Sequence, residues 1–160
     1  MKKLILFRHA KSRWDLGVKD QLRDLEQIGI ERTHKTAKHL KSILDFDIEF
    51  WQSSPAVRAN KTAEITATYF PEKPMIHINE NLYTFSFFDL LKQIKNIPDE
   101  HQTAIVFGHN EAFTEFVNRM GNRYLENLPT SGAAIISFDS PNWQGIEKGT
   151  TQTIIKPKEL

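Results

Sequence analysis

The sequence has no cysteine among its 160 residues. This absence excludes a disulfide framework, a thiolate nucleophile and a cysteine-ligated zinc site, and it fits a cytoplasmic protein. An excess of one charge is also missing, since 21 lysines and arginines stand against 20 aspartates and glutamates. Proteins that coat nucleic acid usually carry a strong basic excess, so the net charge of +1 predicts no nucleic-acid partner.

Long apolar runs are absent too. The four apolar residues 4–7 end at Arg8, which falls short of the about 7–15 apolar residues of a signal peptide. No run approaches the roughly 18 residues of a membrane-spanning helix, so we expect no membrane partner. The composition, 39% hydrophobic and 26% charged, excludes a disordered, collagen-like or coiled-coil chain. The length suits a single domain over residues 1–160.

Short apolar runs alternate with amphipathic segments along the chain. Runs typical of strands occupy residues 3–7, 48–53, 75–78, 103–107, 133–139 and 151–156. Helical patterns cover residues 29–44, 56–69, 87–97 and 111–120. This alternation is typical of an α/β domain, and we expect the last two strands to pair antiparallel. The predicted fold is a three-layer α/β/α sandwich whose mostly parallel central sheet has one antiparallel edge strand.

Two of the predicted strands run directly into histidine. Arg8 and His9 follow the first strand, and His109 follows the fourth, after a glycine. The second strand ends in Ser-Ser-Pro, and Arg58 lies in the first turn of the helix that comes next. Ligands of open α/β sheets bind beyond the carboxyl ends of the strands. If these strands are neighbours, two histidines and two arginines converge at one edge of the sheet.

Such a set of side chains suits a phosphoryl group. Arginine binds phosphate oxygens with a planar fork of N–H donors. A histidine with one free nitrogen can attack phosphorus and form a covalent phosphoenzyme, while a second histidine stabilises charge on the oxygens. A single histidine after a strand is more often structural, so the pattern by itself leaves a structural role for His9 and His109 open.

Three segments resemble the motifs of the histidine phosphatase superfamily, whose members have a phosphoglycerate mutase-like fold. The first is Leu-Phe-Arg-His-Ala at residues 6–10, with Ala10 in place of the usual glycine. The second lies within residues 53–63, and the third is Gly-His-Asn at residues 108–110. The order and the spacing of the three segments both match the family.

The resemblance is closest to the small SixA-type phosphohistidine phosphatases of this superfamily. It rests on the first motif extended to Ser12, on Trp14, on Asp20, Arg23 and Leu25, on Gly29, on Leu82 and Tyr83, and on residues 128–132. One position departs from this subgroup: Leu22 stands where an aspartate is often found, so any role of that aspartate is lost here.

The resemblance implies a phosphatase in which His9 attacks phosphorus and becomes phosphorylated, with no metal or other cofactor. The other residues that it places around the phosphate are Arg8, Arg58 and His109 in the pocket, Lys11 and Ser12 beside the first motif, and Arg23 at the rim. Water then hydrolyses the intermediate. We also expect Nδ1 of His9 to donate to a backbone carbonyl, which leaves Nε2 free to attack.

Many members of the superfamily protonate the leaving oxygen with a carboxylic acid that lies between the second arginine and the second histidine. Glu80 is the best-placed candidate by its order in the chain. The P–N bond of phosphohistidine is already labile, so such an acid is needed mainly if the protein is a small-molecule phosphomonoester phosphatase. A non-catalytic phosphate-binding domain is the other alternative.

The favoured substrate is a phosphorylated protein rather than a small phosphate ester. Only 51 positions separate Arg58 from His109, and the predicted elements fill them, so no segment remains for a large lid. Residues 1–23 carry a net charge of +5, which would steer an anionic substrate towards a neighbouring pocket. Within this segment we expect Lys2 and Lys3 to lie on a solvated face. The oligomeric state stays open, with a monomer favoured.

Overall fold

The computed structural model describes residues 1–15 and 17–160. Over these residues one sheet contains the strands β1 Lys2–Arg8, β2 Phe50–Ser53, β3 Ile76–Ile78, β4 Thr103–Gly108, β5 Ala133–Phe138 and β6 Thr150–Ile155. The α-helices are α1 Gln27–Ile43, α2 Val57–Ala67, α3 Phe87–Lys95 and α4 Ala112–Met120. Each predicted strand and helix is present, with ends that differ from the predicted ones by at most 2 residues.

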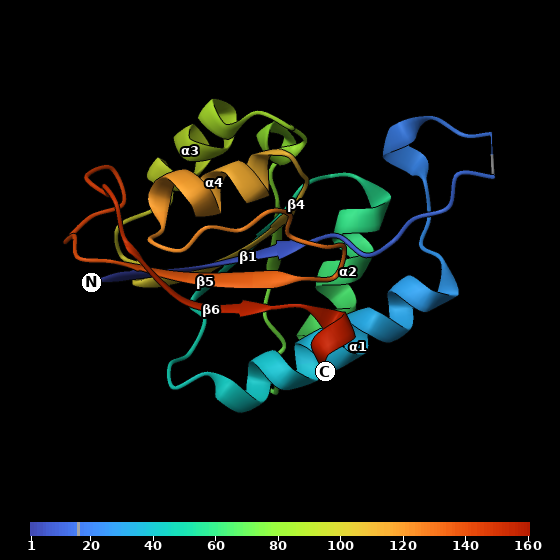
Figure 1. The fold of residues 1–160 in the computed structure, drawn as a ribbon, viewed down its shortest axis with the longest axis horizontal. Coiled ribbons are helices and arrows are strands. Elements are labelled where there is room, and N and C mark those ends of the chain that lie inside the picture. The colour runs from blue at the N-terminus through green and yellow to red at the C-terminus, as the bar shows by residue number, and fades with distance from the viewer. Residues whose placement is uncertain (16) are drawn as a thin grey trace.

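The strands lie in the order β3-β2-β4-β1-β5-β6 (Figure 1). The first four pair parallel, whereas β5 pairs antiparallel with both β1 and β6. The predicted antiparallel pairing of the last two strands is confirmed. The antiparallel strand is internal, however, so its predicted place at an edge is wrong. The chain returns through residues 139–149 and adds β6 to the free side of β5, which makes β6 the edge strand.

Helices cover both faces of the sheet, as a three-layer fold requires. Figure 1 shows α3 and α4 on one face and α1 and α2 on the other. In β1, Leu4 and Leu6 belong to the core under α3 and α4, and Ile5 and Phe7 belong to the core under α1 and α2. A strand buried on both faces needs no polar residues, which explains its continuous apolar run. None of the described helices combines the length and apolar character that crossing a membrane requires.

The register of the parallel strands brings their carboxyl ends together. Arg8 lies opposite Gly108 in the β1–β4 pair, and Ser53 lies opposite Phe107 in the β2–β4 pair. The contact continues one residue further, since the backbone N–H of His9 donates to the Gly108 carbonyl at 3.1 Å. The residues that follow β1, β2 and β4 therefore share one edge of the sheet.

Two stretches between β1 and α1 lie against each other near this edge. The N–H of Arg13 donates to the Asp24 carbonyl at 2.7 Å, and the N–H of Glu26 donates to the Lys11 carbonyl at 2.9 Å. Gly29 of α1 packs so closely here that a Cβ atom would lie 2.6 Å from the Lys11 oxygen. The glycine thus lets α1 hold the segment that follows His9 against the end of the sheet.

Candidate active site

His9 lies directly after β1 and is 8% exposed. Its Nδ1 is 2.7 Å from the carbonyl oxygen of Ala10. A carbonyl can only accept, so Nδ1 carries the proton, as expected from the sequence, and Nε2 has its lone pair free. Burial, followed by the positive charges of Arg58 and Arg8, lowers the pKa of His9 to about 3. The ring is therefore neutral at neutral pH.

His109 follows β4, and its ring centroid lies 5.3 Å from that of His9. Nε2 of His109 is 2.8 Å from Ser54 Oγ, and Nδ1 is 3.5 Å from Arg58 Nη2. A guanidinium can only donate, so Nδ1 is the acceptor and the Nε2–H donates to the serine hydroxyl. Burial, with the nearby His9 and Arg58, lowers the pKa of His109 to about 3. The second histidine is also neutral, and polar contacts fix it on two sides.

The two arginines are buried beside this pair. Arg58, in the first turn of α2, is 2% exposed, and its Nη1 and Nη2 donate to the carbonyl oxygen and Oδ2 of Asp20 at 2.7 and 2.9 Å. Arg8 Nη1 donates to the Leu128 carbonyl at 2.8 Å, and burial lowers the pKa of Arg8. The buried Nε atoms of both arginines have no hydrogen-bond partner among the described residues. Each guanidinium thus keeps a donor that an oxyanion could use.

Asp20 holds the cations of the site, and the sequence did not identify it as a site residue. Its carboxylate accepts from Arg58, from Arg23 Nε and Nη2 at 3.2 and 3.1 Å, and from the Tyr83 hydroxyl. Burial opposes ionisation, but hydrogen bonds from Tyr83 and Arg58 outweigh it and lower the pKa of Asp20 to about 2. The sequence signal that could have identified Asp20 is its place three residues before Arg23. Its other two partners, Arg58 and Tyr83, lie 38 and 63 positions away and give no local signal.

Tyr83 and Phe85 form an aromatic wall beside His109. The centroid of each ring lies 5.4 Å from the centroid of the His109 ring. The motif resemblance included Tyr83 without giving it a function, and it did not include Phe85. Aromatic rings packed on an imidazole keep water from it, which adds to the burial that favours the neutral form of His109.

The substrate-binding residues predicted near the first motif separate into two groups. Ser12 is buried and accepts a hydrogen bond from Arg23 Nη1, while Cζ of Arg23 lies 3.5 Å from the centroid of the Trp14 ring. The structure thus joins Ser12 and Arg23 at the rim of the site. Lys11 is exposed instead and pairs with Glu26 at 3.7 Å. Its side chain has no polar contact with the central histidines and arginines within the described chain.

Glu80 lies in a 3₁₀ turn, Glu80–Leu82, and is exposed. It lines a surface depression together with Tyr83, Asp89 and Lys92. Within residues 1–15 and 17–160, its carboxylate makes no hydrogen bond or ion pair. Tyr83, three positions later, is the residue of this segment that contacts the site. A function of Glu80 as general acid stays a prediction.

Only part of the positive charge of the N-terminal segment gathers at the site, where Arg8 and Arg23 lie. Lys2 is fully buried at the other end of β1, where its ammonium donates to the carbonyls of Asp99 and His101 at 2.8 and 2.9 Å. The expectation of a solvated Lys2 is wrong, because these carbonyls replace the water around the ammonium. Nearer the site, Arg13 is paired with Asp15 at 3.0 Å. Part of the +5 net charge, which already counts Asp15 against Arg13, is therefore remote from His9.

The site as a whole suits nucleophilic attack on an anion. A neutral histidine with a free nitrogen lies among buried donors that can hold negatively charged oxygens. Among the described residues, no cluster of three or more histidine, aspartate or glutamate side chains is arranged to hold a metal ion.

Comparison with known proteins gives the family. The family model of the histidine phosphatase superfamily, branch 1, matches residues 4–126. The chain belongs to this superfamily. The matched part of this superfamily member contains all four central residues of the site, Arg8, His9, Arg58 and His109. Membership supports phosphatase activity.

Solved structures have the same fold as this superfamily member. The protein histidine phosphatase SixA, complexed with tungstate, gives a TM-score of 0.81 at 20% identity, with 98% of each chain covered. SixA of Agrobacterium tumefaciens gives 0.82 at 21% identity, again with 98% of each chain covered. An uncharacterised protein of Mycobacterium leprae is 25% identical over 160 residues, which cover 92% of this chain and 96% of the relative. The predicted phosphoglycerate mutase-like fold of the SixA type is confirmed.

Proposed function

We propose that this superfamily member hydrolyses phosphohistidine in a protein, without a metal ion, through a phosphohistidine intermediate on His9. The observation that carries the proposal is the state of His9. Its ring is buried and neutral, with Nδ1 bound to the Ala10 carbonyl and Nε2 free beside Arg8, Arg58 and His109. A neutral imidazole with one free nitrogen is the nucleophile that attack on phosphorus requires.

In the first step, Nε2 of His9 attacks phosphorus, and the bond from phosphorus to the imidazole of the substrate breaks. The substrate ring, protonated on its other nitrogen, leaves as neutral imidazole. His9 becomes positively charged as the new P–N bond forms, and the hydrogen bond from Nδ1–H to the Ala10 carbonyl stabilises that charge. Arg8 and Arg58 stabilise the charge on the phosphoryl oxygens, with their unpartnered Nε atoms among the available donors.

His109 takes up a proton when the dianionic phosphoryl group enters, because a nearby negative charge favours the imidazolium. The Nε2–H already donates to Ser54, so the new proton goes to Nδ1, on the side of Arg58. Nδ1–H then donates to a phosphoryl oxygen. In this account Ser54 is a positioning residue that fixes which nitrogen of His109 meets the substrate.

In the second step, water attacks the phosphorus of phospho-His9. The P–N bond breaks, inorganic phosphate leaves and Nε2 of His9 is free again. Imidazole is the leaving group in both steps. Since an imidazole leaves far more readily than an alkoxide, neither step needs a strong general acid.

The carboxylates of the site favour phosphohistidine over a phosphate ester. An ester would need a proton donor for its alkoxide, but Asp20, with a pKa of about 2, is ionised and accepts hydrogen bonds instead. Glu80 is exposed, and among the described residues its carboxylate has no hydrogen bond or ion pair with Arg8, Arg58 or the two histidines. The fold similarity to a protein histidine phosphatase complexed with tungstate supports the same substrate class.

The test compares initial rates on a phosphohistidine peptide and on a simple alkyl phosphate. Wild type and His9→Ala are assayed with a metal chelator present. Loss of phosphate from the peptide alone, abolished by His9→Ala, is the expected result. Equal or faster turnover of the alkyl phosphate would instead indicate a working general acid and a small-molecule substrate. Binding of phosphate without turnover of either would indicate a non-catalytic domain.

A further inference from the structure

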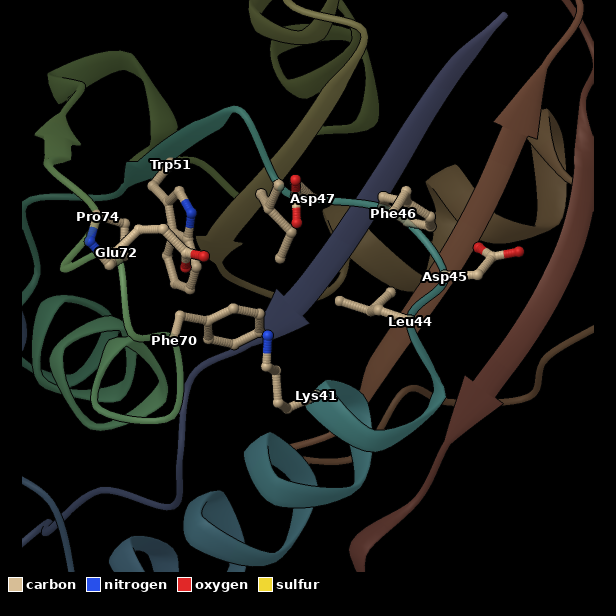
Figure 2. A pocket seen from close by; sticks show the side chains of 10 residues that line it. Lys41, Leu44, Asp45, Phe46, Asp47, Trp51, Phe70, Glu72 and Pro74 are labelled. Carbon is tan, nitrogen blue, oxygen red and sulfur yellow. The ribbon is translucent and has the colours of Figure 1, made fainter.

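A cavity lies at the opposite end of β2 from the active site, where α1 ends and β2 begins (Figure 2). Its volume is about 470 Å³, which is within the range of small-ligand pockets. None of the residues that line it belongs to the active site. Figure 2 shows Trp51, Phe70 and Glu72 on one side, Leu44, Phe46 and Asp47 across from them, and the Lys41 ammonium reaching towards Phe70.

One wall of this cavity is aromatic and carries a free donor. Trp51 and Phe70 are 3% and 7% exposed, and their ring centroids lie 5.0 Å apart in an edge-to-face arrangement. The indole N–H of Trp51 donates to no acceptor in residues 1–15 and 17–160. Figure 2 shows the indole nitrogen on the side of the ring that faces Asp47. The indole nitrogen is not one of the fully buried unpartnered atoms, so its N–H opens into the cavity, where an oxygen acceptor can reach it.

The polar residues of the cavity are mostly acidic. Asp45, Asp47 and Glu72 line it, and their carboxylates make no ion pair or hydrogen bond with the described residues. The cation of the lining is Lys41, whose Nζ lies 5.0 Å from the centroid of the Phe70 ring. The lining therefore has a net charge of −2, and its aromatic face already attracts a cation from this chain.

We infer that this cavity binds an arginine side chain of a polypeptide together with the adjoining backbone carbonyl. A guanidinium is planar, so it can stack on Phe70 and donate in parallel to the Asp47 or Glu72 carboxylate. A guanidinium cannot accept a hydrogen bond from the Trp51 N–H, whereas the oxygen of a peptide carbonyl can. The two requirements together select an arginine residue over a free guanidine compound. Lys41 would leave the face of Phe70 when the guanidinium binds.

The test is a titration of the ¹⁵N-labelled protein with the peptide acetyl-Gly-Arg-Gly-amide, followed by the indole N–H signal of Trp51. A saturable shift of that signal is expected, with a Kd on the order of 1 mM for so small a ligand. Ethylguanidine, which has the same single charge but no carbonyl, and a peptide with citrulline in place of arginine should each bind at least threefold more weakly. An equal affinity for either compound, or no shift with the arginine peptide, would overturn the inference.

Charge variants test the proposal further, because some should weaken peptide binding and one should strengthen it. Asp47→Asn and Glu72→Gln should each weaken peptide binding by about two- to fivefold, because each removes a negative charge near the guanidinium. Lys41→Met should strengthen binding by a similar factor, because it removes a competing cation from Phe70. The matched control is Glu147→Gln, an exposed acid outside the lining, which should change nothing. Weaker binding to Lys41→Met would contradict the proposal, and none of these readouts depends on phosphatase activity.

Discussion

Acid should destabilise the protein through its two buried histidines. His9 and His109 have pKa values of about 3 in the fold, each lowered from 6.5. Above pH 6.5 the rings are neutral in both the folded and the unfolded chain. Below this pH the unfolded chain takes up protons while the folded chain does not. The stability is therefore complete above pH 6.5 and falls as the pH drops towards 3.

The size of the effect follows from the two pKa shifts. Each histidine changes the free energy of unfolding by about 1.4 kcal/mol per pH unit in this window. A change from pH 7.5 to pH 5 therefore removes about 2 kcal/mol for each ring, or about 4 kcal/mol for the pair. Asp20 adds little here, because both its folded pKa of about 2 and its usual value of 3.8 lie below pH 5.

Urea unfolding at the two pH values measures this loss directly. The comparison uses wild type, His109→Gln and, as a matched control, His34→Gln at an exposed position. His109→Gln should lose about 2 kcal/mol less than wild type between pH 7.5 and pH 5. His34→Gln should lose as much as wild type. An equal loss in wild type and His109→Gln would refute the claim that burial keeps this ring neutral.

Three further substitutions test the polar contacts of the site. Ser54→Ala removes the acceptor of the His109 Nε2–H, so the turnover number on a phosphohistidine peptide should fall about tenfold; an unchanged value would speak against a positioning role. Asp20→Asn removes the negative charge beside Arg58, so tungstate should inhibit the enzyme more tightly, and weaker inhibition would contradict this electrostatic argument. Glu80→Gln should keep phosphohistidine turnover within about twofold, because imidazole leaves without a strong acid. A tenfold loss would identify Glu80 as that acid.

The sequence was enough to predict the centre of the site because chain direction and burial constrain it strongly. β1 and β4 are continuous apolar runs, which marks them as strands with both faces covered. In parallel strands the carboxyl ends meet at one edge, so His9 and His109 had to lie close together once β1 and β4 were neighbours. The family resemblance added Arg23 and Ser12, which the structure joins at the rim.

The spacing of residues along the sequence did not predict the polar contacts that hold the central residues of the site in place. Asp20 bonds to residues 38 and 63 positions away, and the resemblance that included it with Arg23 did not show these partners. Lys2 was misplaced for a similar reason, because the carbonyls that surround its ammonium lie 97 and 99 positions further along. Lysine is seldom buried, so composition gave no reason to expect it. The position of β5 depended on how β6 is added to the sheet, which the hydrophobic pattern does not encode.

The most direct measurement is rapid quenching of the protein during turnover of a phosphohistidine peptide, followed by mass spectrometry under conditions that preserve P–N bonds. The account predicts a phosphoryl group on His9 that forms and decays at rates compatible with turnover, and no such group in His9→Ala. Turnover without any phosphoenzyme, or a phosphoryl group on His109 instead of His9, would contradict the account.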